Sequence, residues 1–234
     1  MLSERSSRVT RVLLSADIHG GNKMNNNEKA KVAVLVSGGG TNLQAIIDAV
    51  RSGVIRNAEI SLVVSNNPSA YALTRAENAG IMSQIISKKE CGSQEAFEAK
   101  LIDTLTESGI ELIVLAGFMS ILSADFTKRY DHRIINVHPS LIPSFCGKGF
   151  YGLRVHEAAL AYGVKVTGAT VHYVNEIPDG GEIILQKSVS VKKGESPESL
   201  QQRVMKQAEW KILPRAVELV AKEIITNRKV NEVK

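Results

Sequence analysis

The chain has 234 residues, of which 44% are hydrophobic and 23% charged, and its formal net charge is +5. This composition is typical of a globular protein with one large or two small domains, and no apolar run approaches the ~20 residues that a membrane-spanning helix needs. Lysines and arginines form no stripe interleaved with aromatic residues. We therefore expect small-molecule partners, and neither nucleic acid nor a membrane.

Cysteine usage and the chain ends give further expectations. Cys91 and Cys146 lie far apart and outside any metal-ligand spacing, which favours a reducing, cytoplasmic compartment and no bound metal. Residues 1–30 differ in character from the rest of the chain, and we expect them to be a disordered extension, with Met24 as the natural start. A single domain then spans residues 31–226, followed by a tail over 227–234.

Strands and helices alternate from residue 31 onward. The first strand, 32–36, is a continuous apolar run that ends at glycines, as a buried parallel strand does. The helix over 42–51 carries its apolar residues on one face. Further strands are predicted over 60–65, 81–87, 112–115 and 133–137, with helices over 69–78, 95–108 and 124–130 between them.

The pattern changes after Pro143. An aromatic-rich loop over 144–152 precedes a helix over 154–161 and two alternating strands, 167–174 and 182–191, which we expect to pair antiparallel at a sheet edge. A long helix over 197–225, kinked at Pro214, closes the domain. The chain is therefore predicted to be α/β, with a doubly wound, mostly parallel sheet and an antiparallel edge; ligands of such sheets bind beyond the carboxyl ends of the strands.

The glycines at 38–40 follow the first strand and precede a helix, which is a phosphate-binding arrangement. Glycines let the backbone approach the ligand, and the helix N-terminus supplies free N–H groups. Thr41 and Asn42 either add hydrogen bonds to the ligand or only cap the helix. A dinucleotide loop is disfavoured, because position 43 is leucine and the second strand ends in Ser65 and Asn66, without a carboxylate for a ribose.

Asn136, His138 and Asp179 each lie on or just after an apolar strand-like run. An amide donates to an oxyanion, an imidazole moves a proton, and a carboxylate orients the imidazole and raises its pKa. The set suits acyl transfer without a protein nucleophile, with His138 held protonated by Asp179. The alternative is a surface histidine and a turn aspartate that never meet. His172 is expected to be structural, with support of this set as the second possibility, and His19, His132 and His156 to be surface or structural residues.

Four segments resemble the phosphoribosylglycinamide formyltransferases, a folate-dependent family. They read VSGGGTNLQAII at 36–47, LAGFMSIL at 115–122, INVHPSL at 135–141 and DGG at 179–181. The resemblance implies a Rossmann-like formyltransferase fold. It also implies transfer of the formyl group of 10-formyltetrahydrofolate, a co-substrate, to the amine of glycinamide ribonucleotide in purine biosynthesis, by a monomer or homodimer.

The same resemblance implies roles for individual residues. The catalytic trio is Asn136, His138 and Asp179. The positions that match ribonucleotide-binding residues are Gly40, Thr41, Asn42 and Glu209, and those that match folate-binding residues are Gln94, Met119, Ser120, Ile121, Leu122 and Asn136. Relatives often carry arginine where this chain has Ser120 and Gln94. Any folate contact that uses charge at those two points is therefore weaker or rearranged here, while backbone contacts over 119–122 are unaffected.

Three other functions remain open from the sequence. A formyltetrahydrofolate hydrolase shares the amide, imidazole and carboxylate but needs no phosphate loop, and typically carries an additional N-terminal domain. A methionyl-tRNA formyltransferase needs a C-terminal domain that binds nucleic acid. A non-catalytic nucleotide-binding module would not need Asn136, His138 and Asp179 together, and loss of turnover without loss of binding in His138→Ala would exclude it.

Overall fold

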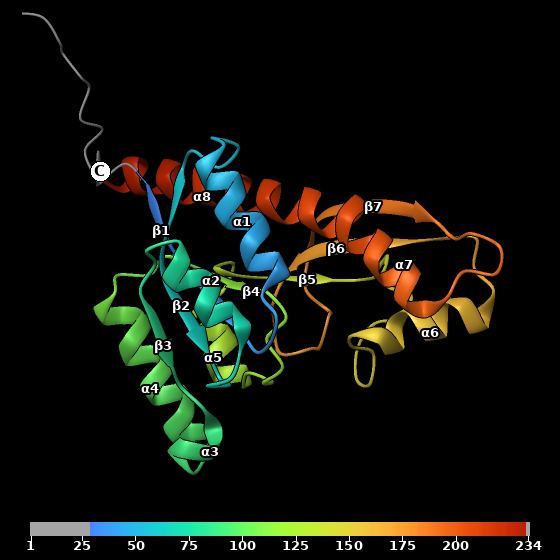
Figure 1. Cartoon of the computed structure of the whole chain (residues 1–234). Coiled ribbons are helices and arrows are strands. Elements are labelled where there is room, and N and C mark those ends of the chain that lie inside the picture. The colour runs from blue at the N-terminus through green and yellow to red at the C-terminus, as the bar shows by residue number, and fades with distance from the viewer. Residues whose placement is uncertain (1–28, 233–234) are drawn as a thin grey trace, which may run out of the picture.

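Seven strands form one sheet in the computed structural model of the chain, which describes residues 29–232. The strand order is β3-β2-β1-β4-β5-β6-β7; β1 to β5 pair in parallel, whereas β6 and β7 are antiparallel to their neighbours (Figure 1). The strands are β1 Ala30–Val36, β2 Ala58–Ser65, β3 Ser83–Ile85, β4 Leu112–Leu115, β5 Ile134–His138, β6 Val166–Tyr173 and β7 Ile183–Ser190. The predicted doubly wound sheet with an antiparallel edge is confirmed.

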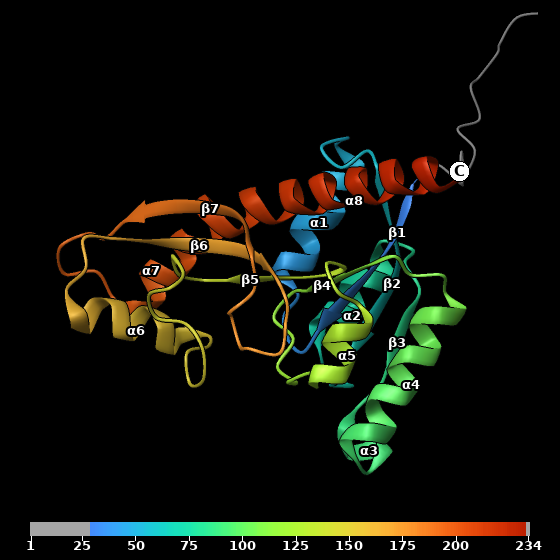
Figure 2. The same cartoon turned by 180° about the vertical axis from the view of Figure 1, so that it is seen from behind.

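Helices cover both faces of this sheet (Figures 1 and 2). The core on one face is shared with α1, α2, α7 and α8, and the core on the other with α4 and α5. The helices are α1 Thr41–Arg51, α2 Tyr71–Asn78, α3 Lys88–Cys91, α4 Gln94–Glu107, α5 Ala124–Arg129, α6 Leu153–Tyr162, α7 Pro197–Val204, the π-helix η2 Met205–Glu209, and α8 Trp210–Glu232.

The burial of strand β1 explains why residues 32–36 include no polar side chain. Val32, Val34 and Val36 point into the core under α1 and α8, and Ala33 and Leu35 point into the core under α4. All five side chains are fully buried. A central parallel strand buried on both faces reads as a continuous hydrophobic sequence, which is the pattern that predicted it.

Several boundaries differ from the predictions. The strand predicted over 81–87 is only three residues long, and the short α3 was not predicted. Helical structure covers the predicted range 197–225 without a gap, but the π-helix η2 divides it into α7 and α8, and α8 runs on to Glu232. Strand β1 starts at Ala30, one residue inside the expected extension. The predictions for residues 1–28, including Met24 and His19, lie outside the described residues.

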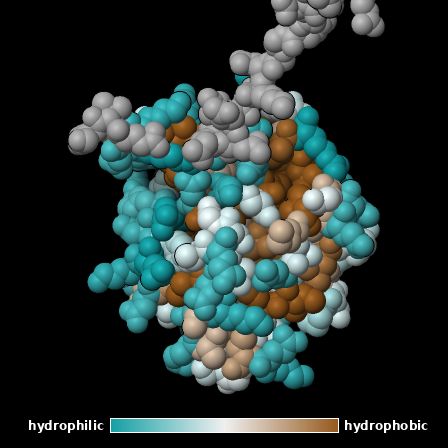
Figure 3. All heavy atoms as spheres, turned by 90° about the vertical axis from the view of Figure 1, so that its left-hand side faces the viewer, coloured by the Kyte–Doolittle hydropathy of each residue, from teal (hydrophilic) through white to brown (hydrophobic). Residues whose placement is uncertain are grey.

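The edge strand β3 lies on the left of Figure 1, and Figure 3 shows that side of the molecule. Brown hydrophobic residues reach the surface there between teal hydrophilic ones. Met82 and Ile85 are among the exposed large hydrophobic residues. Because β3 has only three residues, this edge offers little backbone for pairing with another strand. Over the described residues, none of the helices combines the length and apolarity needed to span a bilayer.

Candidate active site

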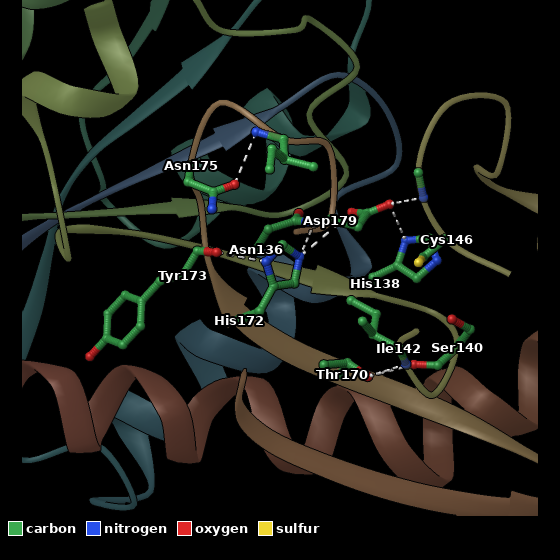
Figure 4. Close-up of polar contacts among 12 residues, drawn as sticks. Asn136, His138, Ser140, Ile142, Cys146, Thr170, His172, Tyr173, Asn175 and Asp179 are labelled. Carbon is green, nitrogen blue, oxygen red and sulfur yellow. Dashed lines mark hydrogen bonds and ion pairs between the residues drawn. The ribbon is translucent and has the colours of Figure 1, made fainter. Parts of the chain in front are cut away.

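Strand β5 and the loop before β7 bring Asn136, His138 and Asp179 together (Figure 4). One oxygen of Asp179, Oδ2, is 3.4 Å from Nδ1 of His138 and accepts a 2.8 Å hydrogen bond from the backbone N–H of Gly147. The other oxygen, Oδ1, is 3.6 Å from Nε2 of His172. The structure thus brings the three predicted residues together and adds His172 and Gly147 to them.

The Asp-Gly-Gly sequence explains how the carboxylate reaches this position. Asp179 has a φ of +57°, in the left-handed region that side chains other than glycine seldom adopt. Gly181 packs directly on the backbone of Tyr173, where a Cβ atom would overlap the carbonyl oxygen. The loop can therefore fold back against the end of β6 only with glycine at 181, and this approach directs Asp179 toward β5.

His172 lies in register opposite Asn136 in the antiparallel pairing of β5 and β6. Its Nδ1 is 2.7 Å from the carbonyl oxygen of Tyr173, so Nδ1 carries the proton in the neutral ring. Its Nε2 then accepts from the amide nitrogen of Asn136, 3.2 Å away. This bond uses one amide hydrogen of Asn136 and leaves the second for a ligand. Of the two readings that the sequence left open for His172, these contacts with Asn136 and Asp179 favour support of the catalytic set.

His138 is buried, with 4% of its surface exposed. Both ring nitrogens face acceptors, because Nε2 is 2.8 Å from the carbonyl oxygen of Phe145 and Nδ1 faces Asp179. Burial nevertheless lowers the pKa of His138 below its ordinary value, against the opposing effect of Asp179. The lowered pKa favours a neutral ring at rest, in contrast to the expectation that Asp179 holds it protonated.

Asp179 itself is ionised at neutral pH. Burial raises the pKa of this carboxyl, but the polar groups around it, the Gly147 N–H among them, outweigh burial, and the net pKa is lowered. A fixed negative charge thus lies beside a neutral imidazole. Such a pair is suited to a ring that accepts a proton during a reaction, because the carboxylate stabilises the imidazolium that forms.

Polar contacts also fix the turn that follows His138. The hydroxyl of Thr170 donates to the carbonyl oxygen of Ser140, 2.7 Å away, and accepts from the N–H of Ile142 at 3.1 Å (Figure 4). The hydroxyl of Ser140 in turn donates to the carbonyl oxygen of Ser144. These bonds hold the start of the 144–152 loop, and with it the Phe145 carbonyl that faces His138.

The glycine loop after β1 lies at the N-terminus of α1. Gly40 has a φ of +69°, and a Cβ there would clash with Ala72 of α2. No side chain caps α1, so its first N–H groups remain available to an anion. Asn42 does not cap the helix; its amide nitrogen donates instead to Oε2 of Glu209, at 2.7 Å. The structure thus brings Gly40 and Asn42, which are neighbours in the sequence, together with the distant Glu209.

Glu209 is almost completely buried, and burial raises the pKa of its carboxyl, with the bond from Asn42 opposing this effect. It is the last residue of the π-helix η2. Such five-residue widenings of a helix occur frequently at functional sites. Glu209 is therefore a buried carboxylate beside a helix N-terminus, as expected of a group that contacts a polar ligand.

The segment 119–122 forms a further wall of the candidate site. The N–H of Met119 donates to the hydroxyl of Ser37, and the amide nitrogen of Gln94 donates to the carbonyl oxygen of Ile121, at 2.8 and 3.1 Å. Ser120 accepts from the Asn66 side chain at 2.7 Å. The Met119 and Ile121 side chains are 57% and 77% exposed, whereas Leu122 is buried. This wall thus presents apolar side chains on a backbone that is tied to the sheet.

Two adjoining cavities, of about 140 and 810 Å³, open beside Asn136 and Asp179. The smaller is lined by the 174–179 loop and by His172, and the larger by His138 and the 147–152 loop. The residues that line both are Phe118, Ser120, Ile121, Asn136, Pro178 and Asp179. Gly40 and Asn42 line neither, and Thr41 lines a separate cavity of about 150 Å³. Over residues 29–232, no group of histidine, cysteine, aspartate or glutamate is arranged to hold a metal ion.

A family model described as formyl transferase matches residues 30–217. Phosphoribosylglycinamide formyltransferase of Haemophilus influenzae is 42% identical over 184 residues, which are 79% of this chain and 84% of that protein. The chain belongs to the phosphoribosylglycinamide formyltransferase family. Glycinamide ribonucleotide transformylase 1 of Symbiobacterium toebii has a similar structure, with a TM-score of 0.79, 38% identity, and coverage of 87% of this chain and 93% of that one.

Longer relatives contain a segment of the same family. The trifunctional purine biosynthetic protein adenosine-3 of Gallus gallus is 46% identical over 208 residues. These residues are 89% of this chain but only 20% of that protein, so the chain spans about a fifth of the length of this relative. The predicted family and the formyltransferase fold are confirmed by these similarities.

The remaining histidines differ in environment. His132 is exposed and close to Asp131, as expected of a surface residue. His156 on α6 is fully buried, and neither of its ring nitrogens has a hydrogen-bond partner among the described residues. Burial lowers the pKa of His156 to about 4, with the nearby His138 as a lesser cause. His156 is therefore a structural histidine that is neutral at physiological pH.

Proposed function

We propose that the chain transfers the formyl group of 10-formyltetrahydrofolate to the amine of glycinamide ribonucleotide, giving formylglycinamide ribonucleotide for purine biosynthesis. The observation that carries this proposal is the group of Asn136, His138, His172 and Asp179 beside two adjoining cavities, in a chain of this family. We also propose that residues 31–226 act as one catalytic domain.

The two substrates are assigned to different sides of the group. The ribonucleotide phosphate binds at the N-terminus of α1, over Gly40, Thr41 and Asn42, with Glu209 near the nucleotide. The pteridine of the folate enters the smaller cavity, against Leu122 and the 174–179 loop. The amine and the formyl group then meet at Asn136, which lines both cavities, and at His138, which lines the larger one.

In the proposed mechanism the amine attacks the formyl carbon, and the formyl oxygen becomes an oxyanion. The second amide hydrogen of Asn136, which His172 leaves free, donates to that oxygen. Neutral His138 takes the proton that the attacking amine loses, and Asp179 stabilises the imidazolium. His138 returns the proton to the departing folate nitrogen as the carbon–nitrogen bond breaks. The chain supplies no nucleophile of its own.

Because Nε2 of His138 faces the Phe145 carbonyl and Nδ1 faces Asp179, one contact must open for the ring to reach the substrate. The 3.4 Å contact with Asp179 is the longer of the two. Whichever contact opens, the carboxylate remains close enough to favour the charged ring, since the interaction of two charges falls only gradually with distance.

The test is an absorbance assay of 10-formyltetrahydrofolate deformylation, with and without glycinamide ribonucleotide. We expect turnover that requires the ribonucleotide and falls at least about a hundredfold in His138→Ala. The matched control is His132→Ala, which removes an exposed histidine and should leave turnover unchanged. Deformylation that ignores the ribonucleotide would identify a hydrolase instead. Turnover in neither case would refute both functions.

A further inference from the structure

The residues around the two cavities carry very few positive charges. Among the described residues that line them, Lys148 is the one lysine or arginine, while Glu176 and Asp179 are carboxylates. Asp179 is already engaged by the Gly147 N–H and by His138. Any anionic part of a ligand that extends along the larger cavity therefore has a single cationic side chain to meet.

The 119–121 segment, which lines the larger cavity as Lys148 does, carries no charge, and the polar side chains of Ser120 and of the nearby Gln94 already have partners. The Gln94 amide donates to the carbonyl oxygen of Ile121 and to Oε1 of Glu98, and the Ser120 hydroxyl accepts from Asn66. These bonds stabilise the 119–122 backbone. The side chains of Gln94 and Ser120 therefore offer no charge to a carboxylate of the ligand.

Lys148 lies in a loop whose backbone is anchored. Gly147 and Gly149, on either side of it, have φ values of +84° and +94°, which favour glycine. The N–H of Gly147 is bound to Asp179, and the N–H of Phe150 donates to the carbonyl oxygen of Gly147, at 2.8 and 3.1 Å. The Lys148 side chain is exposed and makes no hydrogen bond or ion pair within residues 29–232. Its ammonium group is thus available, on a backbone fixed relative to the catalytic carboxylate.

The neighbouring aromatic residue is held in place as well. Tyr151 lines the same cavity, is 46% exposed, and has the guanidinium of Arg154 over its ring at 4.9 Å. The exposed Ile121 side chain lines this cavity too. A flat ring between an aliphatic and an aromatic side chain is favourably packed. The larger cavity therefore suits an aromatic group followed by an anion.

A tetrahydrofolate has this sequence of parts, namely a pteridine, an aminobenzoyl ring and one or more glutamates. With the pteridine in the smaller cavity and the formyl group at Asn136, the benzoyl ring continues between Ile121 and Tyr151. We propose that Lys148 binds the glutamate carboxylates and makes the enzyme prefer folates with several glutamates; this inference rests on the proposed function. The ribonucleotide phosphate is a less suitable partner for Lys148, because Gly40 and Asn42 do not line this cavity.

The experiment compares wild type with Lys148→Gln, Lys148→Arg and the control Lys193→Gln, which removes an exposed charge in the turn after β7. The measured quantities are kcat and KM for 10-formyltetrahydrofolate with one or three glutamates, at low salt and at 0.5 M salt (about a 4–5 Å Debye length). We expect Lys148→Gln to raise the folate KM about two- to fivefold at low salt, the range of an exposed ion pair, with the larger effect on the triglutamate.

The other kinetic measurements distinguish a folate-binding role of Lys148 from a general loss of activity. The kcat and the KM for the ribonucleotide should stay within about twofold of wild type, Lys148→Arg should keep the triglutamate preference, and high salt should remove the difference between wild type and Lys148→Gln. An increase in the ribonucleotide KM instead would assign Lys148 to the phosphate and overturn the inference. An unchanged folate KM, or an equal change in Lys193→Gln, would overturn it too.

If the proposed formyl transfer is wrong, the result differs from the one obtained if only the role of Lys148 is wrong. If wild type turned over neither substrate, calorimetric titration with pteroylmonoglutamate and pteroyltriglutamate would still test Lys148. Tighter binding of the triglutamate that disappears in Lys148→Gln would support the inference while formyl transfer is refuted. Equal binding of both pteroylglutamates by wild type would refute the role of Lys148 itself.

Discussion

The bond between Asn42 and Glu209 links α1 to the π-helix, and Asn42→Ala should destabilise the protein in a pH-dependent way. The amide of Asn42 donates to a buried carboxylate at 2.7 Å. A hydrogen bond to a charged group contributes about 1.5–3 kcal/mol, and alanine regains about 0.5 kcal/mol of helix propensity. We expect a net loss of about 1–2.5 kcal/mol at pH 8.5. For a domain of this size that corresponds to a fall of about 2–10 °C in Tm.

The sign of the pH effect follows from the raised pKa of Glu209. Burial raises the folded-state pKa of this carboxyl above its unfolded value of 4.5, so its contribution is present below pH 4.5 and is lost as pH rises through the folded pKa. The Asn42 bond opposes that loss, since it stabilises the ionised form. The difference between wild type and Asn42→Ala should therefore be small at pH 4.5 and largest at pH 8.5.

The assay is thermal and urea unfolding followed by circular dichroism at both pH values, carried out as a double-mutant cycle with Glu209→Gln. The cycle isolates the pair from other effects of each substitution. We expect a coupling free energy of about 1–2 kcal/mol at pH 8.5. Coupling near zero, or an Asn42→Ala loss that is the same at both pH values, would show that the 2.7 Å contact does not couple the two side chains.

Three further predictions concern the histidines and Asp179. Asp179→Asn should lower kcat about ten- to a hundredfold, because the imidazolium loses a charged partner. It should also shift the acidic limb of the kcat/KM profile to lower pH, since Asp179 raises the pKa of His138. A shift of that limb to higher pH would contradict this reasoning. His172→Phe should lower kcat about fivefold or more with little change in either KM, because Asn136 loses its 3.2 Å partner, and a kcat equal to wild type in steady-state assays would exclude that role. His156→Leu should remove an acid-side instability. With a folded pKa of about 4 and an unfolded pKa of 6.5, wild type should lose about 2 kcal/mol between pH 7.5 and pH 5 in urea unfolding, and equal pH dependence in both proteins would refute this.

Much of the fold could be predicted because its signals are local. The run over 32–36 is apolar on both faces, and the structure buries both faces of that strand. The final helix was predicted less well. Helical periodicity continues through Met205–Glu209, but a π-helix adds a residue to the turn, which a 3.6-residue pattern does not reveal. The break therefore lies before Pro214, the residue whose missing N–H had indicated a kink.

The candidate site likewise contains some residues that the sequence marks and others that it does not. Asn136 and His138 are recognisable because they lie at the carboxyl end of a buried parallel strand. Asp179 follows β6, which is antiparallel to β5, so the fold-back of the loop after β6 is needed to bring this carboxylate to the same place. Glu209 was reached through family resemblance alone, since nothing in the local sequence directs it toward Asn42. The Phe145 carbonyl and the Gly147 N–H belong to the backbone of a loop. Backbone groups are common to all residues, so the sequence does not mark these two.

His172 shows that strand register, as well as a sequence motif, determines which residues form a site. Its contact with Asn136 depends on the antiparallel register that pairs residue 136 with residue 172. A shift of one residue would turn His172 to the other face of the sheet, where it could not reach Asn136 or Asp179. Long-range contacts stabilise this register, since the Thr170 hydroxyl of β6 binds the backbone of Ser140 and Ile142, just after β5. The free amide hydrogen on which the proposed transfer depends is thus set by the pairing of two strands and not by the sequence around Asn136 alone.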